Sequence, residues 1–150
     1  MIQTKTKILI KDNSPLLEAN CINYSNNSSS KKGAKIGSCI KISVSKIKST
    51  LNKDRSASAP ALRETSIGRP LHSVLVIQTK ALAHRGDGST LQFNCNSGVS
   101  IILKKAGTKK SQQLGFKRVN STIPFELKNK AHMQKVKIAS SVVKLAKHLL

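Results

Sequence analysis

The sequence predicts a mainly β protein: a small closed barrel of five or six short strands, with short helices towards the C-terminus. Three observations support this fold class. Val, Ile and Leu gather in short runs that alternate with polar residues, which favours strands over long helices. Segments of helical periodicity do not separate these runs, as a parallel βαβ sheet would require. Aromatic residues make up 3% of the chain and Trp is absent, so the core must be aliphatic.

The chain of 150 residues is expected to form one domain spanning 1–150. Its N-terminus should be a single half-buried strand, because β-branched residues occupy every second position. These positions are Ile2, Thr4, Thr6, Ile8 and Ile10. Residues 12–15 should turn, since Asp, Asn and Pro favour turns. A second strand is expected over residues 18–24, with Cys21 buried.

A polar loop at residues 26–33 separates the second strand from the third, which is expected over residues 38–47. Gly37 should make a tight turn just before it. Alternate Ile and Val residues share one face of this strand, and Lys41 lies on the other. The third strand is therefore also half-buried.

Residues 48–69 carry the weakest structural signal, because they are rich in Ser, Ala and charge and contain Pro60. We expect an extended, partly disordered insertion. The alternative is a short helix around residues 59–65.

A hairpin is predicted around Gly86-Asp87-Gly88, because Asp-Gly between two alternating runs is a strong local hairpin signal. The apolar run at residues 74–77 leads into it, and a further strand follows at residues 98–103. We expect the hairpin to be one strand pair of the barrel. Lys80, His84 and Arg85 would place positive charge near its tip.

The C-terminal third is expected to hold a basic loop, two helices and a last strand. The loop spans residues 104–113, and a short helix follows Pro124 over residues 125–129. Alternation predicts a strand over residues 134–139, and Ser140 or Ser141 is expected to cap a helix that runs to Leu150. Its apolar face would comprise Val142, Val143, Ala146, Leu149 and Leu150, opposite Lys144, Lys147 and His148.

The charge balance favours a polyanion as partner. The net charge is +21, from 27 Lys and Arg against 6 Asp and Glu. Self-repulsion on this scale opposes compaction, and nucleic acid relieves it because each neutralised phosphate releases counterions. A solvated basic surface is the less favoured reading. No apolar run is long enough to span a bilayer, and the N-terminus lacks the apolar stretch of a secretory signal.

Catalytic, metal and cofactor sites are not expected. The six acidic residues are isolated along the chain, and Asp12, Asp87 and Glu126 fit turns or a helix start. Cys21, Cys39 and Cys95 form no Cys-x-x-Cys pair and have no His at zinc-ligand spacing. Gly86 and Gly88 are not a dinucleotide fingerprint, because no helix follows them.

Basic clusters are the remaining candidates for function. Twelve Lys or Arg lie between Lys104 and Lys147, with Glu126 as the one acid. Exposed aromatic residues for base stacking are nearly absent, so folded RNA read through its backbone fits better than single strands. The candidate RNA-binding residues are Lys41, Lys80, His84, Arg85, Lys104, Lys105, Lys109, Lys110, Lys117, Arg118 and Lys135.

Short blocks reach nearly from end to end in the order of one known family. They are Met1-Ile2-Gln3, Asp12-Asn13-Ser14, Ile40-Lys41-Ile42, residues 74–80, Asp87-Gly88-Ser89 with Phe93, Asn96 with residues 99–103, Gly115, Glu126-Leu127, and Met133 with residues 135–139. The chain thereby resembles the universal large-subunit ribosomal protein number fourteen family, in its bacterial and organellar form. Pro15, Ser38 and Gly86 depart from the family's usual Gly, acid and Pro.

The resemblance implies a five-stranded barrel that binds large-subunit ribosomal RNA and is not an enzyme. It also implies neighbouring large-subunit proteins, small-subunit RNA across an intersubunit bridge, and the ribosome silencing factor as partners. Residues 48–69 are longer than the family's loop, and the C-terminal extension at residues 140–150 reaches beyond the family's end.

Divergence, a composition typical of an AT-rich genome and the lack of a presequence indicate a mitochondrial ribosome with the protein made inside the organelle. The alternatives are a plastid or a bacterial cytoplasm. A free nucleic-acid-binding protein, such as a nucleoid or translation factor, is the alternative function.

Overall fold

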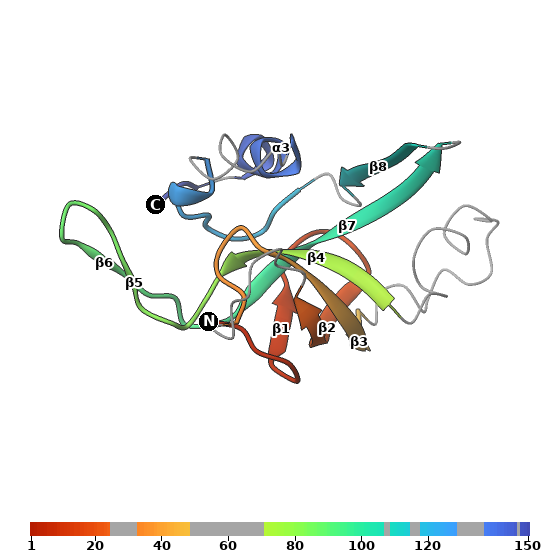
Figure 1. Cartoon of the computed structure of the whole chain (residues 1–150), viewed down its shortest axis with the longest axis horizontal. Helices are drawn as coiled ribbons and strands as arrows, with labels where there is room; N and C mark the ends of the chain where they lie inside the picture. The colour runs from red at the N-terminus through yellow and green to blue at the C-terminus, as the bar shows by residue number, and fades with distance from the viewer. Residues whose placement is uncertain (25–32, 49–70, 107–108, 115–117, 129–136, 147) are drawn as a thin grey trace.

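The computed structural model describes residues 1–24, 33–48, 71–106, 109–114, 118–128, 137–146 and 148–150, and all structural statements concern these (Figure 1). A six-stranded sheet has the order β1-β2-β3-β4-β7-β8, and β5 pairs with β6 in a separate sheet. The elements are β1 (Lys7–Ile10), β2 (Leu16–Tyr24), β3 (Cys39–Ile47), β4 (Leu71–Gln78), β5 (Ala83–His84), β6 (Thr90–Leu91), β7 (Ser97–Ala106), β8 (Lys109–Leu114) and α3 (Lys137–Leu145).

The sheet closes into a five-stranded barrel because β1 also pairs with β7. Leu9 lies opposite Ser97 and Ile10 opposite Gly98, and this pairing is parallel, whereas the other pairings of the sheet are antiparallel. Closure removes the free edges that an open sheet would expose. The predicted mainly β barrel with short C-terminal helices is therefore confirmed.

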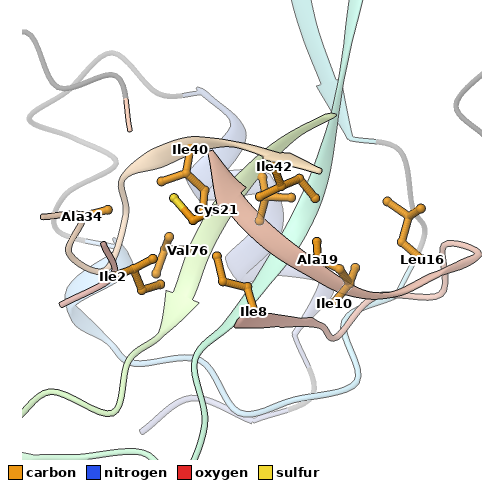
Figure 2. Close-up of a cluster of buried hydrophobic side chains, with 11 residues drawn as sticks. Ile2, Ile8, Ile10, Leu16, Ala19, Cys21, Ala34, Ile40, Ile42 and Val76 are labelled. Atoms are coloured by element: carbon orange, nitrogen blue, oxygen red, sulfur yellow. The ribbon is translucent and has the colours of Figure 1, made fainter. Parts of the chain in front are cut away.

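The barrel interior is filled by mostly aliphatic side chains from β1, β2, β3 and β4 (Figure 2). Its buried members are Ile2, Ile8, Ile10, Leu16, Ala19, Cys21, Ala34, Ile40, Ile42, Val74 and Val76. Burying each large aliphatic side chain contributes about 1.5–3 kcal/mol. The predicted burial of Cys21 is confirmed, at 2% exposure.

Strand β4 is buried on both faces, which explains its continuous apolar run. Val74 and Val76 point into the barrel, while Leu75 and Ile77 belong to a second cluster outside it. The C-terminal segment covers that outer face with Val119, Ile123, Leu127 and Val142. Figure 1 shows this segment and α3 lying over the barrel. We call the described residues 118–128, 137–146 and 148–150 the C-terminal layer. The fold thus has one barrel core and one C-terminal layer, and the two meet at β4.

The N-terminal strand is shorter than predicted. The chain turns at residues 4–5, where Lys5 has a φ of 66°, and β1 begins only at Lys7. The turn lets Ile2 pair with Ala34, while the Lys5 N–H donates to the Cys21 carbonyl at 2.7 Å. The continuous strand was wrong because these long-range pairings compete with local alternation.

The second and third strands and the turn at Gly37 are confirmed. Strand β2 begins at Leu16, two residues earlier than expected, and β3 begins at Cys39. Gly37 has a φ of 84°, a left-handed conformation that favours glycine. The polar loop and the insertion fall largely on residues 25–32 and 49–70, which lie outside the described residues.

The predicted basic loop at residues 104–113 is wrong. Most of these residues form the end of β7 and the start of β8, with Lys104 opposite Ser111 and Lys105 opposite Lys110. Lysine occurs in edge strands as well as in loops, and sequence composition alone does not distinguish the two. We call residues 101–106 and 109–114 the β7–β8 arm, which projects beyond the barrel (Figure 1).

The C-terminal elements also differ from expectation. Lys137–Ala139 belong to α3 and not to a strand, and the rest of that predicted strand lies outside the described residues. Helix α3 ends at Leu145, well before Leu150. Beyond it, Ile123 donates to the His148 carbonyl and accepts from the Leu150 N–H, both at 3.0 Å, so this end is extended.

The short helix predicted after Pro124 is present over residues 126–128. Among the described residues, no helix has the length and apolar content needed to cross a membrane.

Gly98→Ala should destabilise the barrel. A Cβ at this position would lie against the Val74 side chain and 2.9 Å from the Leu75 carbonyl oxygen. Because β4 is packed on both faces, it cannot move away, and we expect a loss of about 1–3 kcal/mol. Urea unfolding followed by circular dichroism measures the change. Gly86→Ala is the matched control, since nothing lies within 4 Å of its new Cβ, and an equal loss there would contradict the packing argument.

Candidate nucleic-acid interface

The predicted RNA-binding residues that the structure describes lie on several different elements. Lys41 is exposed on β3, between Asn23 of β2 and Ser73 of β4. Lys80 is exposed just after β4, and His84 is exposed on β5. Arg118 is exposed at the start of the C-terminal layer. The structure therefore does not bring all of them into one compact patch.

Four predicted lysines share the β7–β8 arm. Lys104 and Lys105 lie near the end of β7, and Lys109 and Lys110 begin β8. Backbone pairing places all four towards the outer end of the arm (Figure 1). Lys117 and Lys135 lie outside the described residues.

The hairpin at Gly86-Asp87-Gly88 is confirmed, but it is not part of the barrel. Strands β5 and β6 form their own two-stranded sheet, the β5–β6 ribbon, which projects away from the barrel (Figure 1). Within the ribbon, only two residues of β5 pair with two residues of β6. The long apolar run of β4 pairs instead with β3 and β7. The local signal predicted the turn correctly and the partner strands wrongly.

The turn of the ribbon is held by Asp87 and Gly88. The Asp87 carboxylate accepts from the Ser89 N–H at 2.9 Å and from the Ser89 hydroxyl at 2.7 Å. These hydrogen bonds favour the charged form and lower the pKa of Asp87. Gly88 has a φ of 84°, which this turn requires. Asp87 is therefore a turn residue, as the sequence indicated.

Arg85 joins the ribbon to the C-terminal layer. Its Nε forms an ion pair with Glu126, and its Nη2 donates to the second Glu126 oxygen at 3.4 Å and to the Leu150 carbonyl at 3.2 Å. The hydrogen bond to Glu126, with a smaller coulombic contribution, raises the pKa of Arg85. Sequence reasoning explained Glu126 by the helix dipole and missed this contact, since the two residues are 41 positions apart.

Asp12 holds the closure of the barrel together. It is 1% exposed, and its Oδ1 accepts from the Ser14 N–H at 2.8 Å, as an Asx turn requires. Its Oδ2 accepts from both the N–H and the hydroxyl of Ser100 on β7, each at 2.7 Å. The sequence predicted the turn but not the bond to β7.

Cys21 and Cys39 behave as apolar residues. Cys21, Cys39 and Cys95 are all free thiols. Burial raises the pKa of Cys21 and Cys39, which keeps those thiols protonated. Among the described residues, no group of His, Cys, Asp and Glu is arranged to hold a metal ion.

The closed barrel, the projecting ribbon and the lysine-bearing arm define a small basic β-barrel protein. The sequence matches the family model described as Ribosomal protein L14p/L23e over residues 1–143, and the chain belongs to this family. It is similar to the Large ribosomal subunit protein uL14c of Helicosporidium sp. subsp. Simulium jonesii, with 29% identity over 127 residues. That match covers 84% of this chain and 86% of the relative.

Family membership confirms the resemblance that the ordered sequence blocks indicated. The chain is a structural constituent of the large ribosomal subunit and is not an enzyme. The isolated acidic residues fit this conclusion, because each one that the structure describes has an internal partner or a place in a turn.

Asp12→Asn should weaken the barrel closure. The substitution replaces a carboxylate by an amide of the same shape, so one of the donors on Ser14 or Ser100 loses its acceptor. An unsatisfied buried donor costs about 1–3 kcal/mol, and we expect a loss of that size. Chemical unfolding measures it. Asp87→Asn, in an exposed turn that Asn also suits, should leave the unfolding midpoint nearly unchanged, and equal effects would contradict a special role for Asp12.

Arg85→Gln should release the ribbon from the C-terminal layer. The Phe125 N–H donates to the Leu150 carbonyl that Arg85 also contacts, so amide exchange at Phe125 and Leu150 should become several-fold faster. Hydrogen exchange measured by NMR reports this, with the amides of residues 74–77 as an unaffected reference. Thr90→Ser, exposed on the same ribbon, is the control. Unchanged exchange at Phe125 in the Arg85 variant would show that the contact does not hold the layer.

Proposed function

We propose that the chain binds large-subunit ribosomal RNA through its exposed lysines and arginines. One observation carries this proposal: the described acidic side chains are used inside the molecule. Asp12 is buried against Ser100, Glu18 pairs with Lys46 at 3.1 Å, and Glu126 pairs with Arg85. Asp87 is bound to its own turn. With 27 basic residues in the chain, most cations have no acidic partner available, and phosphate groups can neutralise them.

The proposed contact residues are those predicted from the sequence, and the support for them differs from one residue to the next. Lys41, Lys80, His84 and Arg118 are exposed and suited to phosphate contacts. The four lysines of the β7–β8 arm lie, by the register of its backbone, at the outer end of a pair of strands. Lys117 and Lys135 stay in the proposed set on sequence grounds alone.

Arg85 is the proposed contact residue with the smallest expected share. Its guanidinium already bonds Glu126 and the Leu150 carbonyl. We expect it to position the ribbon more than it binds RNA.

We further propose a place at the subunit interface, with small-subunit RNA, neighbouring large-subunit proteins and the ribosome silencing factor as partners. Support comes from family membership together with the two projecting elements, the ribbon and the arm, which extend away from the barrel on different sides (Figure 1). An organellar ribosome is the proposed location, with mitochondria ahead of plastids because the chain diverges from the family's usual motifs at Pro15, Ser38 and Gly86.

Sedimentation of ribosomal particles tests the proposed function. The chain should travel with large subunits from purified mitochondria and should stay bound through a moderate salt wash. Recovery only in the free soluble fraction would contradict RNA binding within the particle. Recovery with plastid or cytoplasmic large subunits would contradict the mitochondrial location while leaving the binding proposal intact.

A further inference from the structure

A cavity of about 380 Å³ opens on the outer side of the barrel, where β1 meets the residues that lead into β7. Ile8 and Ile10 point into the barrel, so Lys7 and Leu9, which alternate with them, face outwards into this cavity. Its volume lies within the range of about 300–1,000 Å³ that small-ligand sites occupy. The cavity is also lined by Lys46, Asn94 and Asn96. Neither these three residues nor Lys7 were among the RNA-binding residues predicted from the sequence.

Three lysines from three different elements surround the cavity. Lys7 comes from β1, Lys46 from β3, and Lys80 follows β4. Glu18 is the one acidic residue that lines it, and Glu18 pairs with Lys46 at 3.1 Å. No acidic partner for Lys7 or Lys80 is found among the described residues, so the cavity keeps two uncompensated positive charges.

The wall of the cavity is fixed by backbone and amide hydrogen bonds. The Lys80 N–H donates to Asn96 Oδ1 at 2.9 Å, and the Lys80 carbonyl accepts from Gln92 Nε2 at 3.1 Å. The Asn96 carbonyl in turn accepts from the Leu9 N–H at 3.0 Å. Because Asn96 Oδ1 already accepts the Lys80 N–H, the side-chain NH₂ of Asn96 is the group that remains to contact a ligand, as a donor. A site held in this way loses little entropy when a ligand binds.

The remaining lining supplies what a nucleotide needs besides charge. Leu9 is half-buried and offers an apolar contact. The side-chain amide of Asn94 carries both a donor and an acceptor, and such amides recognise base edges by paired hydrogen bonds. Cys95 also lines the cavity, with its thiol donating to Gln78 Oε1 at 3.7 Å.

We propose that this cavity holds one nucleotide of the bound RNA, with its phosphate held by the ammonium groups of Lys7 and Lys80 and its base edge against the amides of Asn94 and Asn96. The inference rests on the proposed RNA-binding function and adds to it a specific subsite. An acidic peptide would satisfy the two lysines but would leave the amide pair and the Leu9 surface without a matching group. RNA is therefore the occupant that matches the two lysines, the two amides and the apolar surface of Leu9.

The first test compares binding of protein-free large-subunit RNA by the full-length chain and by the double variant Lys7→Gln/Lys80→Gln. Each phosphate that the protein neutralises adds about 0.7–0.9 to the slope of log K against log salt concentration. Lys7 and Lys80 share one phosphate, so the double variant should lose about 0.7–0.9 from the slope. Lys35→Gln/Lys144→Gln is the matched control, because both lysines are exposed, neither lines the cavity and neither is among the proposed contact residues. Equal slopes for the two double variants would overturn the proposal.

The second test uses the Cys95 thiol as a reporter inside the cavity. Alkylation by iodoacetamide, mapped by mass spectrometry, should slow at Cys95 when the RNA is bound. Cys39 is the internal reference, because it is also half-buried but packs against the C-terminal layer. Inorganic phosphate and a poly-glutamate peptide at equal charge concentration serve as separate arms and should protect Cys95 less than RNA does.

The outcomes separate this inference from the proposed function. If the RNA binds tightly but alkylation of Cys95 is unchanged, the cavity is empty in the complex and the inference is wrong, while RNA binding stands. If the poly-glutamate peptide protects Cys95 better than RNA, the occupant is a protein and the inference is also wrong. If the chain does not bind the RNA at all, the proposed function itself fails.

Discussion

The buried carboxylate of Asp12 is the constraint on which the barrel depends. A charged group at 1% exposure is costly to desolvate, and three hydrogen bonds from Ser14 and Ser100 offset that cost. Those bonds tie the turn after β1 to β7, beside the parallel pairing that closes the barrel. Lys48 Nζ covers the same turn by donating to the carbonyls of Asp12 and Ser14, each at 2.8 Å. The closure therefore combines a polar contact with an aliphatic core, and both specify the register of the strands.

The few acidic side chains that the structure describes are bonded within the molecule, and this affects the charge that remains at its surface. Asp12 sets the closure, Glu126 fixes the ribbon, and Glu18 pairs across β2 and β3. A chain with a net charge of +21 repels itself, so a structure that buries or pairs its acids leaves the cations outside for another molecule to neutralise. Under the proposed RNA binding, the stability of the isolated chain and its affinity for the RNA are linked, because the RNA relieves the repulsion that folding creates.

Elements that depend on local signals could be predicted from the sequence, and elements that depend on distant partners could not. The hairpin turn at Asp87 and the continuous apolar run of β4 were recognisable, because turn chemistry and burial leave a direct trace in residue type. The β7–β8 arm was predicted to be a loop, since a lysine-rich composition does not distinguish a strand from a loop. Ala146, just after α3, pairs with Val119, and Leu149 pairs with Ile123, which no local pattern reports. For the same reason, Lys80 and Arg85 could be predicted as candidate residues from the sequence, but their contacts could not. These are the hydrogen bond from Lys80 to Asn96 and the ion pair of Arg85 with Glu126.

The C-terminal layer holds the β5–β6 ribbon in position relative to the barrel. Gln78, at the end of β4, donates to the Thr122 carbonyl at 2.8 Å and accepts from the Ser97 hydroxyl at 2.7 Å, so one side chain joins β4, β7 and that layer. Arg85 then fixes the ribbon to the same layer through Glu126 and Leu150. Phosphate contacts carry little sequence information, so a protein that relies on them must fit the shape of a folded RNA through fixed distances between its cations. A barrel whose ribbon is held by long-range hydrogen bonds, and not by its own two-residue strands, meets that requirement without a large core.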